Sequence, residues 1–222
     1  MPSSERVYRR MKEMIISGEL PPHTRLVELQ FAAEFGVSRT PVREALKRLT
    51  ADKLVHTDPV RGLIVHDPEP HEIQDIYLVR EVLEGLATRL AAQRIAPEEL
   101  QRLRAILDSM HEGLEDGRTD IVVSANLAFH EVIYRAAGNA TLSRLARDLS
   151  DFVRRFSTEA FSSGPRVNTV FDEHEAILKA LEKRDPDEAE RASARHLRAA
   201  SEYMTQLHVR NAIGRHPVSA AS

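Results

Sequence analysis

Three histidines in the second half of the chain have the residue type and the spacing that a metal site requires. Asn126 and His130 stand four residues apart in "ANLAFHEVIY", which places both on one face of a helix. His174 lies 11 residues before Asp185, and His196 lies 11 residues after it. If Asp185 marks the turn of an antiparallel helical hairpin, these two imidazoles lie at the same height, about 16 Å from the turn.

Neutral imidazole is a good ligand for borderline divalent ions. We therefore predict a divalent metal site, for an ion such as zinc or nickel, with Asn126, His130, His174 and His196 as ligands. A single histidine on an amphipathic helix is more often structural. The metal hypothesis depends on three imidazoles at one level of a bundle, and the alternative is that they are core or surface histidines.

A short basic stripe in "GVSRTPVREALKRL" is the second feature that points to chemistry. Arg39, Arg43 and Lys47 recur every four residues, so they share one side of a helix. The opposite side is apolar, with Val42, Leu46 and Leu49. Arginine in the first turns of a helix can bind guanine O6 and N7 with two hydrogen bonds, which lysine cannot reproduce. The alternative is a solvated basic face without a ligand.

Charge is distributed unevenly along the chain, although the total is only −3. Residues 1–67 contain 11 Lys and Arg against 9 Asp and Glu, whereas the remaining residues contain 20 against 25. Nucleic acid responds to the local field more than to the chain average. The absence of cysteine excludes disulfides and thiolate metal sites. No apolar run approaches the roughly 20 residues that cross a bilayer, so we expect a cytoplasmic protein without a membrane partner.

The basic stripe belongs to a segment, residues 1–67, that is predicted to form three helices and a hairpin. An amphipathic helix stops at Gly18, and a second, short helix stops at Gly36. The helix that carries the stripe begins with Ser38 and Thr40 as candidate caps. The stretch "LVHTDPVRGLIVHD" then alternates like two short strands around a turn. This order is typical of a winged helix-turn-helix domain.

Beyond residue 70 the sequence predicts nearly continuous helix, interrupted at proline and glycine positions. The expected helices span 70–94, 97–116, 119–137, 140–163, 167–184 and 187–209. Short connections between them indicate an antiparallel bundle. We therefore expect a mainly α chain. Its parts are a winged helix-turn-helix domain at 1–67, a linker at 68–71, an all-helical effector-binding and dimerisation domain at 72–210 and a disordered tail at 211–222.

The stretch from Gly18 to Val65, and its core "GVSRTPVREAL" above all, resembles the N-terminal domain of GntR-family bacterial repressors. The helical remainder resembles the effector domain of the FadR-like branch of that family. The resemblance implies that Ser38, Arg39, Thr40 and Arg43 contact DNA. It also implies that Arg61 and Gly62, at the tip of the wing, enter the minor groove. His23 stands at a turn position where the family usually has glycine.

The resemblance also sharpens the metal hypothesis. Metal-binding members of the FadR-like branch carry an Asp-x-x-x-His pair, then a histidine, then another histidine about 22 residues later. His130, His174 and His196 match this pattern, and Asn126 stands where the aspartate usually stands. An amide oxygen can ligate but brings no charge, so the ion keeps more positive charge for an anionic ligand such as a carboxylate.

These observations predict a homodimeric, DNA-binding transcriptional regulator, a repressor and not an enzyme, whose binding to duplex operator DNA is controlled by a small organic acid. Two subunits are expected because one recognition helix reads only a few base pairs. Arg80 is a candidate to bind the effector carboxylate, although a structural ion pair with Glu84 is the simpler interpretation. The alternatives are a metal-dependent hydrolase, with Glu131, Glu173 or Glu175 as general base, and a metal-storing helical bundle.

Overall fold

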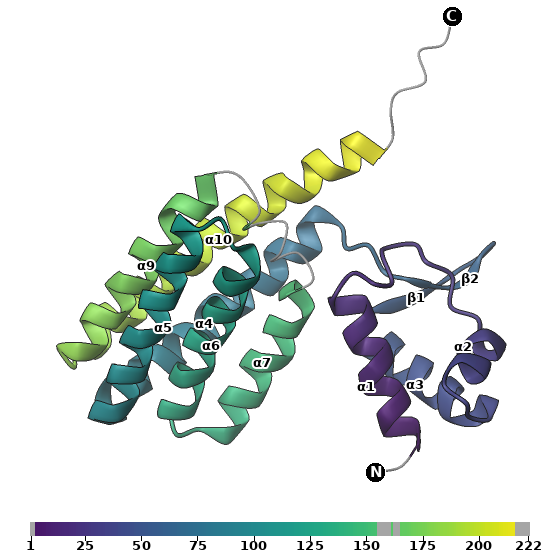
Figure 1. Cartoon of the computed structure of the whole chain (residues 1–222), viewed down its shortest axis with the longest axis horizontal. Helices are drawn as coiled ribbons and strands as arrows, with labels where there is room; N and C mark the ends of the chain where they lie inside the picture. The colour runs from purple at the N-terminus through teal and green to yellow at the C-terminus, as the bar shows by residue number, and fades with distance from the viewer. Residues whose placement is uncertain (1–2, 155–160, 162–164, 216–222) are drawn as a thin grey trace, which may run out of the picture. The chain divides into compact units, whose positions relative to one another are not determined.

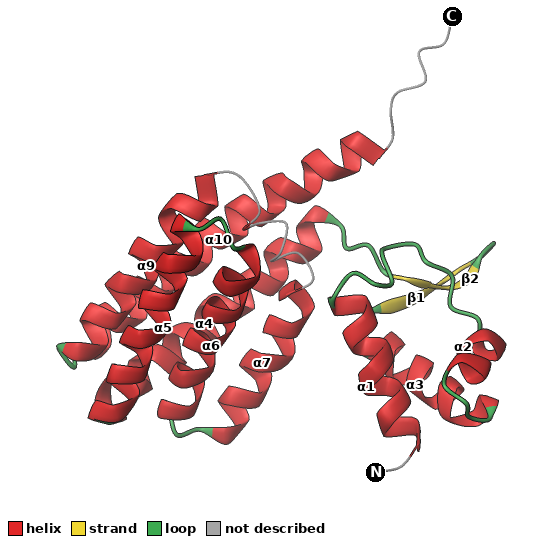
Figure 2. Cartoon of the chain, in the orientation of Figure 1, coloured by secondary structure: helices red, strands yellow, loops and turns green. Residues whose placement is uncertain are grey.

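A computed structural model describes residues 3–154, 161 and 165–215 of the chain. The chain divides into two compact units, Met1–Pro68 and Glu69–Ser222. Figure 1 follows the chain through both units, and Figure 2 shows that strands occur only in the first one within the described part of the chain. The fold is mainly α, with an N-terminal helix-turn-helix and a small hairpin, which confirms the predicted fold class.

The first unit is built from three helices, α1 (Ser3–Ile16), α2 (Glu28–Glu34) and α3 (Arg39–Ala51). Their apolar faces meet in a small core. It includes Val7, Met11, Met14, Ile15, Phe31, Val42, Leu46 and Leu49, all buried. Burial of one face of α3 leaves its other face to solvent, because apolar positions at spacings of three and four occupy a single stripe of a helix.

A two-stranded antiparallel hairpin, β1 (Val55–Asp58) and β2 (Gly62–Val65), completes the first unit. Asp58 pairs with Gly62 across the turn, and Gly62 has a φ of +79°, which glycine adopts without strain. His23 has a φ of +66°. This left-handed conformation explains why glycine suits the position, and histidine is one of the residues that tolerate it.

The second unit is a bundle of α-helices over its described residues. They are α4 (Pro70–Arg94), α5 (Pro97–Glu115), α6 (Thr119–Ala136), α7 (Ala140–Arg154), α9 (Pro165–Glu182) and α10 (Pro186–Arg215). Proline occupies the first position of four of them, where its missing N–H costs nothing. α10 packs along α4 and beside α9. The centre of the bundle is apolar, with Phe129, Leu103, Met110, Ile133 and Leu181 almost fully buried.

α4 spans Pro70–Arg94, as predicted, so the last two residues of the segment predicted as a linker, 68–71, are helical. The other described helix ends agree with the predicted ones to within two residues, except at two places. α10 continues to Arg215, which extends the helix into the region predicted to be a disordered tail, while residues 216–222 lie outside the described residues. The helix predicted over 140–163 is described as far as Arg154, and most of its remaining part lies outside the described residues. No helix of the described chain has both the length and the apolar character that a bilayer span needs.

Candidate functional site

The exposed face of α3 carries the predicted DNA-contacting side chains. Arg39, Arg43 and Lys47 are exposed, while Val42, Leu46 and Leu49 on the opposite face are at most 1% exposed. Ser38 occupies the N-cap position, but its hydroxyl makes no capping hydrogen bond, and Thr40 lies inside the helix. Of the two candidate caps, Ser38 is therefore the N-cap residue but without a side-chain capping bond, and Thr40 is not the cap; both side chains are exposed.

One acidic residue that the sequence analysis did not identify contacts this basic stripe. Glu28 opens α2, and its two carboxylate oxygens accept hydrogen bonds from Nε and Nη2 of Arg43, each at 2.9 Å. Arg39 Nη2 lies 3.3 Å from Glu28 Oε2. Hydrogen bonds from Arg43 lower the pKa of Glu28, so this carboxylate is charged at neutral pH. A contact over 15 residues, between two helices, has no signature in sequence spacing.

The tip of the hairpin places Arg61 in an ordered turn. Asp58 Oδ1 accepts hydrogen bonds from the backbone N–H groups of Val60 and Arg61, at 2.8 and 2.7 Å. These two bonds lower the pKa of Asp58. Arg61 is exposed, and Gly62 follows it at the start of β2. The turn therefore presents a basic side chain on a short, defined loop.

The three predicted histidines come together inside the second unit. His130 on α6, His174 on α9 and His196 on α10 each offer a nitrogen, and these three atoms lie within 4.8 Å of one another. The ring centres of His174 and His196 are 4.5 Å apart. All three residues are buried. The equal distance of His174 and His196 from Asp185 thus placed the two rings at one height, as the antiparallel pairing of α9 and α10 requires.

An oxygen lies against Nδ1 of each of these histidines. His174 Nδ1 donates to the backbone carbonyl of Val170 at 2.7 Å, and His196 Nδ1 donates to Glu173 Oε2 at 2.8 Å. His130 Nδ1 lies 3.1 Å from Glu84 Oε2. At His174 the backbone carbonyl can only accept, so Nδ1 carries the proton and Nε2 is the nitrogen that can bind a metal. At His196, Nη2 of Arg166 also lies 3.2 Å from Nδ1.

Burial keeps two of these imidazoles, those of His174 and His196, in the neutral form that binds metal. Burial and the neighbouring His130 lower the pKa of His174 to about 3. Burial and His174 likewise hold the pKa of His196 well below its usual range. Burial opposes the charge of Glu84, but Arg80 and His130 outweigh it and lower the pKa of that carboxyl to about 2. The cluster therefore contains two rings that stay neutral, those of His174 and His196, close to a buried carboxylate, that of Glu84.

The surroundings of His174 Nε2 indicate whether a metal ion fits the histidine cluster. This nitrogen is buried and has no hydrogen-bond partner. A buried polar atom without a partner is rare because it loses its hydration without compensation. A divalent ion bound by imidazole nitrogens would satisfy this atom, so the donor set suits zinc or nickel.

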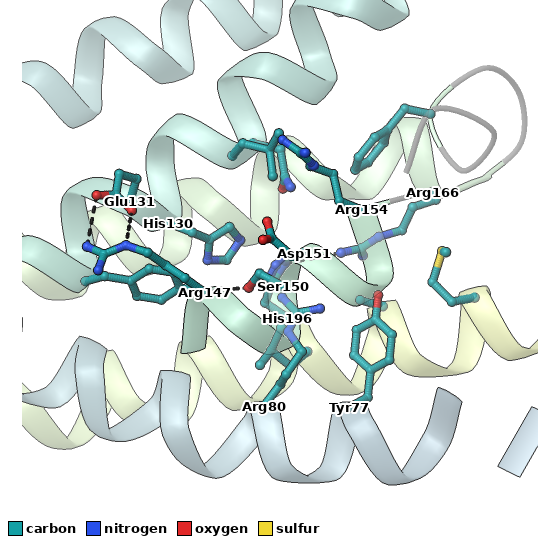
Figure 3. A pocket seen from close by; sticks show the side chains of 17 residues that line it. Tyr77, Arg80, His130, Glu131, Arg147, Ser150, Asp151, Arg154, Arg166 and His196 are labelled. Carbon is teal, nitrogen blue, oxygen red and sulfur yellow. Dashed lines mark hydrogen bonds and ion pairs between the residues drawn. The ribbon is translucent and has the colours of Figure 1, made fainter. Parts of the chain in front are cut away.

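A cavity of about 320 Å³ adjoins the histidines and has an arginine-rich wall. His130, His196 and Asn126 line it. Its charged lining residues are Arg80, Arg147, Arg154, Arg166, Glu131 and Asp151. Figure 3 shows side chains from this lining that reach toward one space beside the imidazoles. Arginines outnumber acidic residues two to one in the wall, which favours an anionic ligand.

Arg80 forms the ion pair with Glu84 that was considered from the sequence, and its position also bears on the predicted effector contact. Its Nε donates to Glu84 Oε1 at 2.7 Å, so the structural ion pair exists, and Arg80 also lines the cavity. Arg166 is buried and pairs with Glu173. Sequence spacing could not identify Glu84 and Glu173 as partners of His130 and His196, because each contact joins side chains on different helices.

The three acidic residues considered as the general base of a hydrolase are all engaged elsewhere. Glu131 accepts hydrogen bonds from Arg135 and Arg147. Glu173 is held by Arg166 and His196, and Glu175 pairs with Lys179 on the surface. The hydrogen bonds from Arg147 and Arg135 lower the pKa of Glu131, so that carboxylate is a poor proton acceptor.

The two units define a class of protein, the winged-helix DNA-binding proteins that carry an additional all-helical domain. Residues 3–65 match the family described as bacterial regulatory proteins, gntR family, and residues 75–199 match the FCD domain. The chain therefore belongs to the gntR family of bacterial transcriptional regulators, in its branch with an FCD domain, and the family's members bind operator DNA and are not enzymes.

Similar proteins support this assignment along nearly the whole chain. The probable D-xylose utilization operon transcriptional repressor of Paenarthrobacter nicotinovorans is 33% identical, over 83% of this chain and 81% of its own. The transcriptional repressor RspR of Escherichia coli is 27% identical, over 95% and 92%. The solved structure of Escherichia coli McbR/YncC has a TM-score of 0.77 at 22% identity, over 94% of this chain and 99% of its own, and so shares the fold.

Proposed function

We propose that this regulator is a repressor that acts as a homodimer in the cytoplasm and whose operator binding is controlled by a small organic acid bound beside a divalent metal. The observation that carries the proposal is the buried group of three histidines beside an arginine-rich cavity. A neutral ligand set leaves positive charge on the ion, and the surrounding guanidinium groups add to it. A carboxylate can bind both the ion and the guanidinium groups.

In the first unit, we assign each proposed DNA contact to the major groove, the phosphates or the minor groove according to its place in the fold. Arg39, Arg43 and Lys47 present their charge on the exposed face of α3, where a recognition helix meets the major groove. The hydroxyls of Ser38 and Thr40 suit phosphate contacts. Arg61 and Gly62 at the hairpin tip suit the minor groove.

In the second unit, the metal would be held by His130, His174 and His196, with the amide oxygen of Asn126 as a fourth donor. The ion would supply positive charge for a carboxylate oxygen. Arg80 lies in the same cavity wall and is anchored by Glu84, so it can present its remaining N–H groups to the same carboxylate. Bound acid and ion thus make contact with residues from α4, α6, α9 and α10 together.

The charge at position 126 provides a test of this shared site. Asn126→Asp adds a negative charge beside the ion, so we expect the metal to bind on the order of tenfold more tightly. The same substitution should weaken the carboxylate, because the ion has less positive charge to offer and the new anion repels the ligand. Calorimetric titration of Zn²⁺ into metal-free protein, then of acetate, lactate and succinate into Zn²⁺-loaded protein, measures both signs.

A tighter metal together with a weaker carboxylate would indicate that the two ligands share one charged site. A purely steric change would weaken the binding of both. Asp120→Asn, on the exposed first turn of α6, is a control outside the cavity that also changes one charge on the same helix. If Asn126→Asp changes neither affinity, Asn126 does not contact the ion. If no added carboxylate binds the wild type either, the proposed effector class is wrong.

An exposed apolar stripe on α4 supports the homodimer. Leu78, Val82 and Leu86 recur every four residues and are 65%, 67% and 40% exposed. A stripe of this kind is suited to a second copy, because two identical uncharged faces are complementary about a two-fold axis. The two-fold symmetry of such a dimer would match two half-sites of an operator.

We expect the double substitution Leu78→Glu and Val82→Glu to convert the protein to a monomer with unchanged helical content. Two charges placed in the stripe would have to lose their hydration on association. Analytical ultracentrifugation measures the mass, and circular dichroism the helical content. Val209→Glu, at an exposed apolar position outside the stripe, is the matched control. A double variant that sediments like the wild type would exclude this face.

A further inference from the structure

The contact between Glu28 and Arg43 joins α2 to the helix that carries the basic stripe. The carboxylate engages one edge of the guanidinium group, the edge formed by Nε and Nη2. The same carboxylate is 3.3 Å from Arg39 Nη2. One anion therefore lies between the first two cations of the stripe.

The geometry of this bond leaves Arg43 able to read a base. A guanidinium group has five N–H donors in a fixed plane. Glu28 occupies the Nε and Nη2 edge, so the edge formed by Nη1 and Nη2 keeps one N–H on each nitrogen. Two parallel donors at that edge are what guanine O6 and N7 require. Arg43 can therefore keep Glu28 and bind a guanine at the same time.

We propose that Glu28 is a positioning residue that sets the sequence specificity of DNA binding, by orienting Arg43 and by neutralising part of the stripe's charge toward phosphates. This inference rests on the proposed reading of operator DNA by α3. An oriented fork loses less conformational freedom when it binds a base. A paired cation also contributes less to the sequence-independent attraction of phosphates, so non-specific binding falls while base reading is retained.

A role in stability alone is the competing explanation, and the exposure of Arg43 argues against it. The side chain of Arg43 is 53% exposed in this ion pair, and that of Glu28 is 22% exposed. Exposed ion pairs contribute little to folding. The buried residues Phe31 and Val42, on α2 and α3, remain in the core when the pair is removed. We therefore expect Glu28→Gln to fold with the melting temperature of the wild type.

The test compares Glu28→Gln with Glu19→Gln in the full-length protein. Glu19 pairs with Arg10 on α1, so its substitution removes the same charge from the same unit without touching the stripe. The probes are an operator selected from random duplexes with the wild type and a scrambled duplex of equal length. Affinity for both is measured by fluorescence anisotropy between 50 and 300 mM KCl, about the range over which phosphate contacts dominate the salt dependence.

For Glu28→Gln we expect the ratio of the affinity for the operator to the affinity for the scrambled duplex to fall about tenfold. Most of this lost preference should concern a guanine position of the operator. The salt slope for scrambled duplex should steepen by about 0.9 for each phosphate contact that the released arginines gain. Glu19→Gln should leave both the ratio and the slope unchanged.

Two results would overturn the inference. One is a Glu28→Gln protein with the same ratio and slope as Glu19→Gln. The other is an equal loss of affinity for both duplexes with an unchanged salt slope, which is the signature of a merely structural residue. A wild type that selects no sequence at all would instead reject the proposed operator reading, and the role of Glu28 with it.

Discussion

Arg43→Ala is expected to lower operator affinity by a factor on the order of 10² or more and to leave the fold intact. A bidentate arginine–guanine contact is worth about 1–3 kcal/mol, and a dimer makes it twice. The side chain of Arg43 is exposed, so its truncation leaves no buried cavity. Gel shift with the selected operator, together with circular dichroism, separates loss of binding from loss of structure.

Arg48→Ala is the matched control for this substitution. Arg48 is also an exposed cation of α3, but it pairs with Glu5 of α1 and stacks on Tyr8. Its loss removes the same charge from the same helix without removing a member of the stripe. If Arg43→Ala retains the operator affinity of Arg48→Ala, the exposed face of α3 does not enter the groove.

The second large effect is expected from His174→Ala, which should reduce the metal content from about one divalent ion per chain to less than about a tenth. Nε2 of His174 is buried without a hydrogen-bond partner, and alanine offers no donor in its place. Elemental analysis after dialysis against a weak chelator measures the metal content. His208→Ala removes another buried histidine, outside the cluster, and should leave the content unchanged.

Loss of packing at position 174 could also lower stability, so His196→Gln provides a second variant that retains most of the volume and removes the imidazole. Both variants should lose the ion. A wild type that folds fully and contains no metal under these conditions would mean that the three histidines serve packing alone.

The helical periodicity of the sequence predicts most of the fold and the core of the metal-site candidate. An α-helix rises by a fixed length per residue, so equal distances of His174 and His196 from Asp185 place them together. Asn126 and His130 share one face for the same reason. The apolar positions of α3 likewise identify which side of the helix faces solvent, and so which arginines are available to DNA.

The partners that orient these residues could not be predicted, because they depend on how each helix is rotated against its neighbours. Glu84 reaches His130 from α4, and Glu173 reaches His196 across the α9–α10 hairpin. Glu28 reaches Arg43 between α2 and α3. Ser38 occupies the predicted N-cap position of α3 but makes no side-chain capping bond, since an exposed hydroxyl can bond to water instead.

The arginines of the cavity wall also could not be predicted from the sequence. Arg166 follows Pro165 at the start of α9 and ends buried beside Glu173 and His196, although nothing in its neighbouring residues distinguishes it from a surface arginine. Arg147 lines the same wall and is paired with Glu131. The clustering of arginines in one wall could not be predicted, because the wall is assembled from several helices.

The central claim is that a carboxylate and a metal act together on DNA binding, and one measurement tests it most directly. Operator affinity is measured for Zn²⁺-loaded and chelator-treated protein, each with and without the tightest-binding acid found among acetate, lactate and succinate. We predict that the acid changes operator affinity by about 5- to 150-fold in the loaded protein, the usual range of coupling between sites, and by less than about twofold in the metal-free protein. An equal change in both forms, or none in either, would contradict the account.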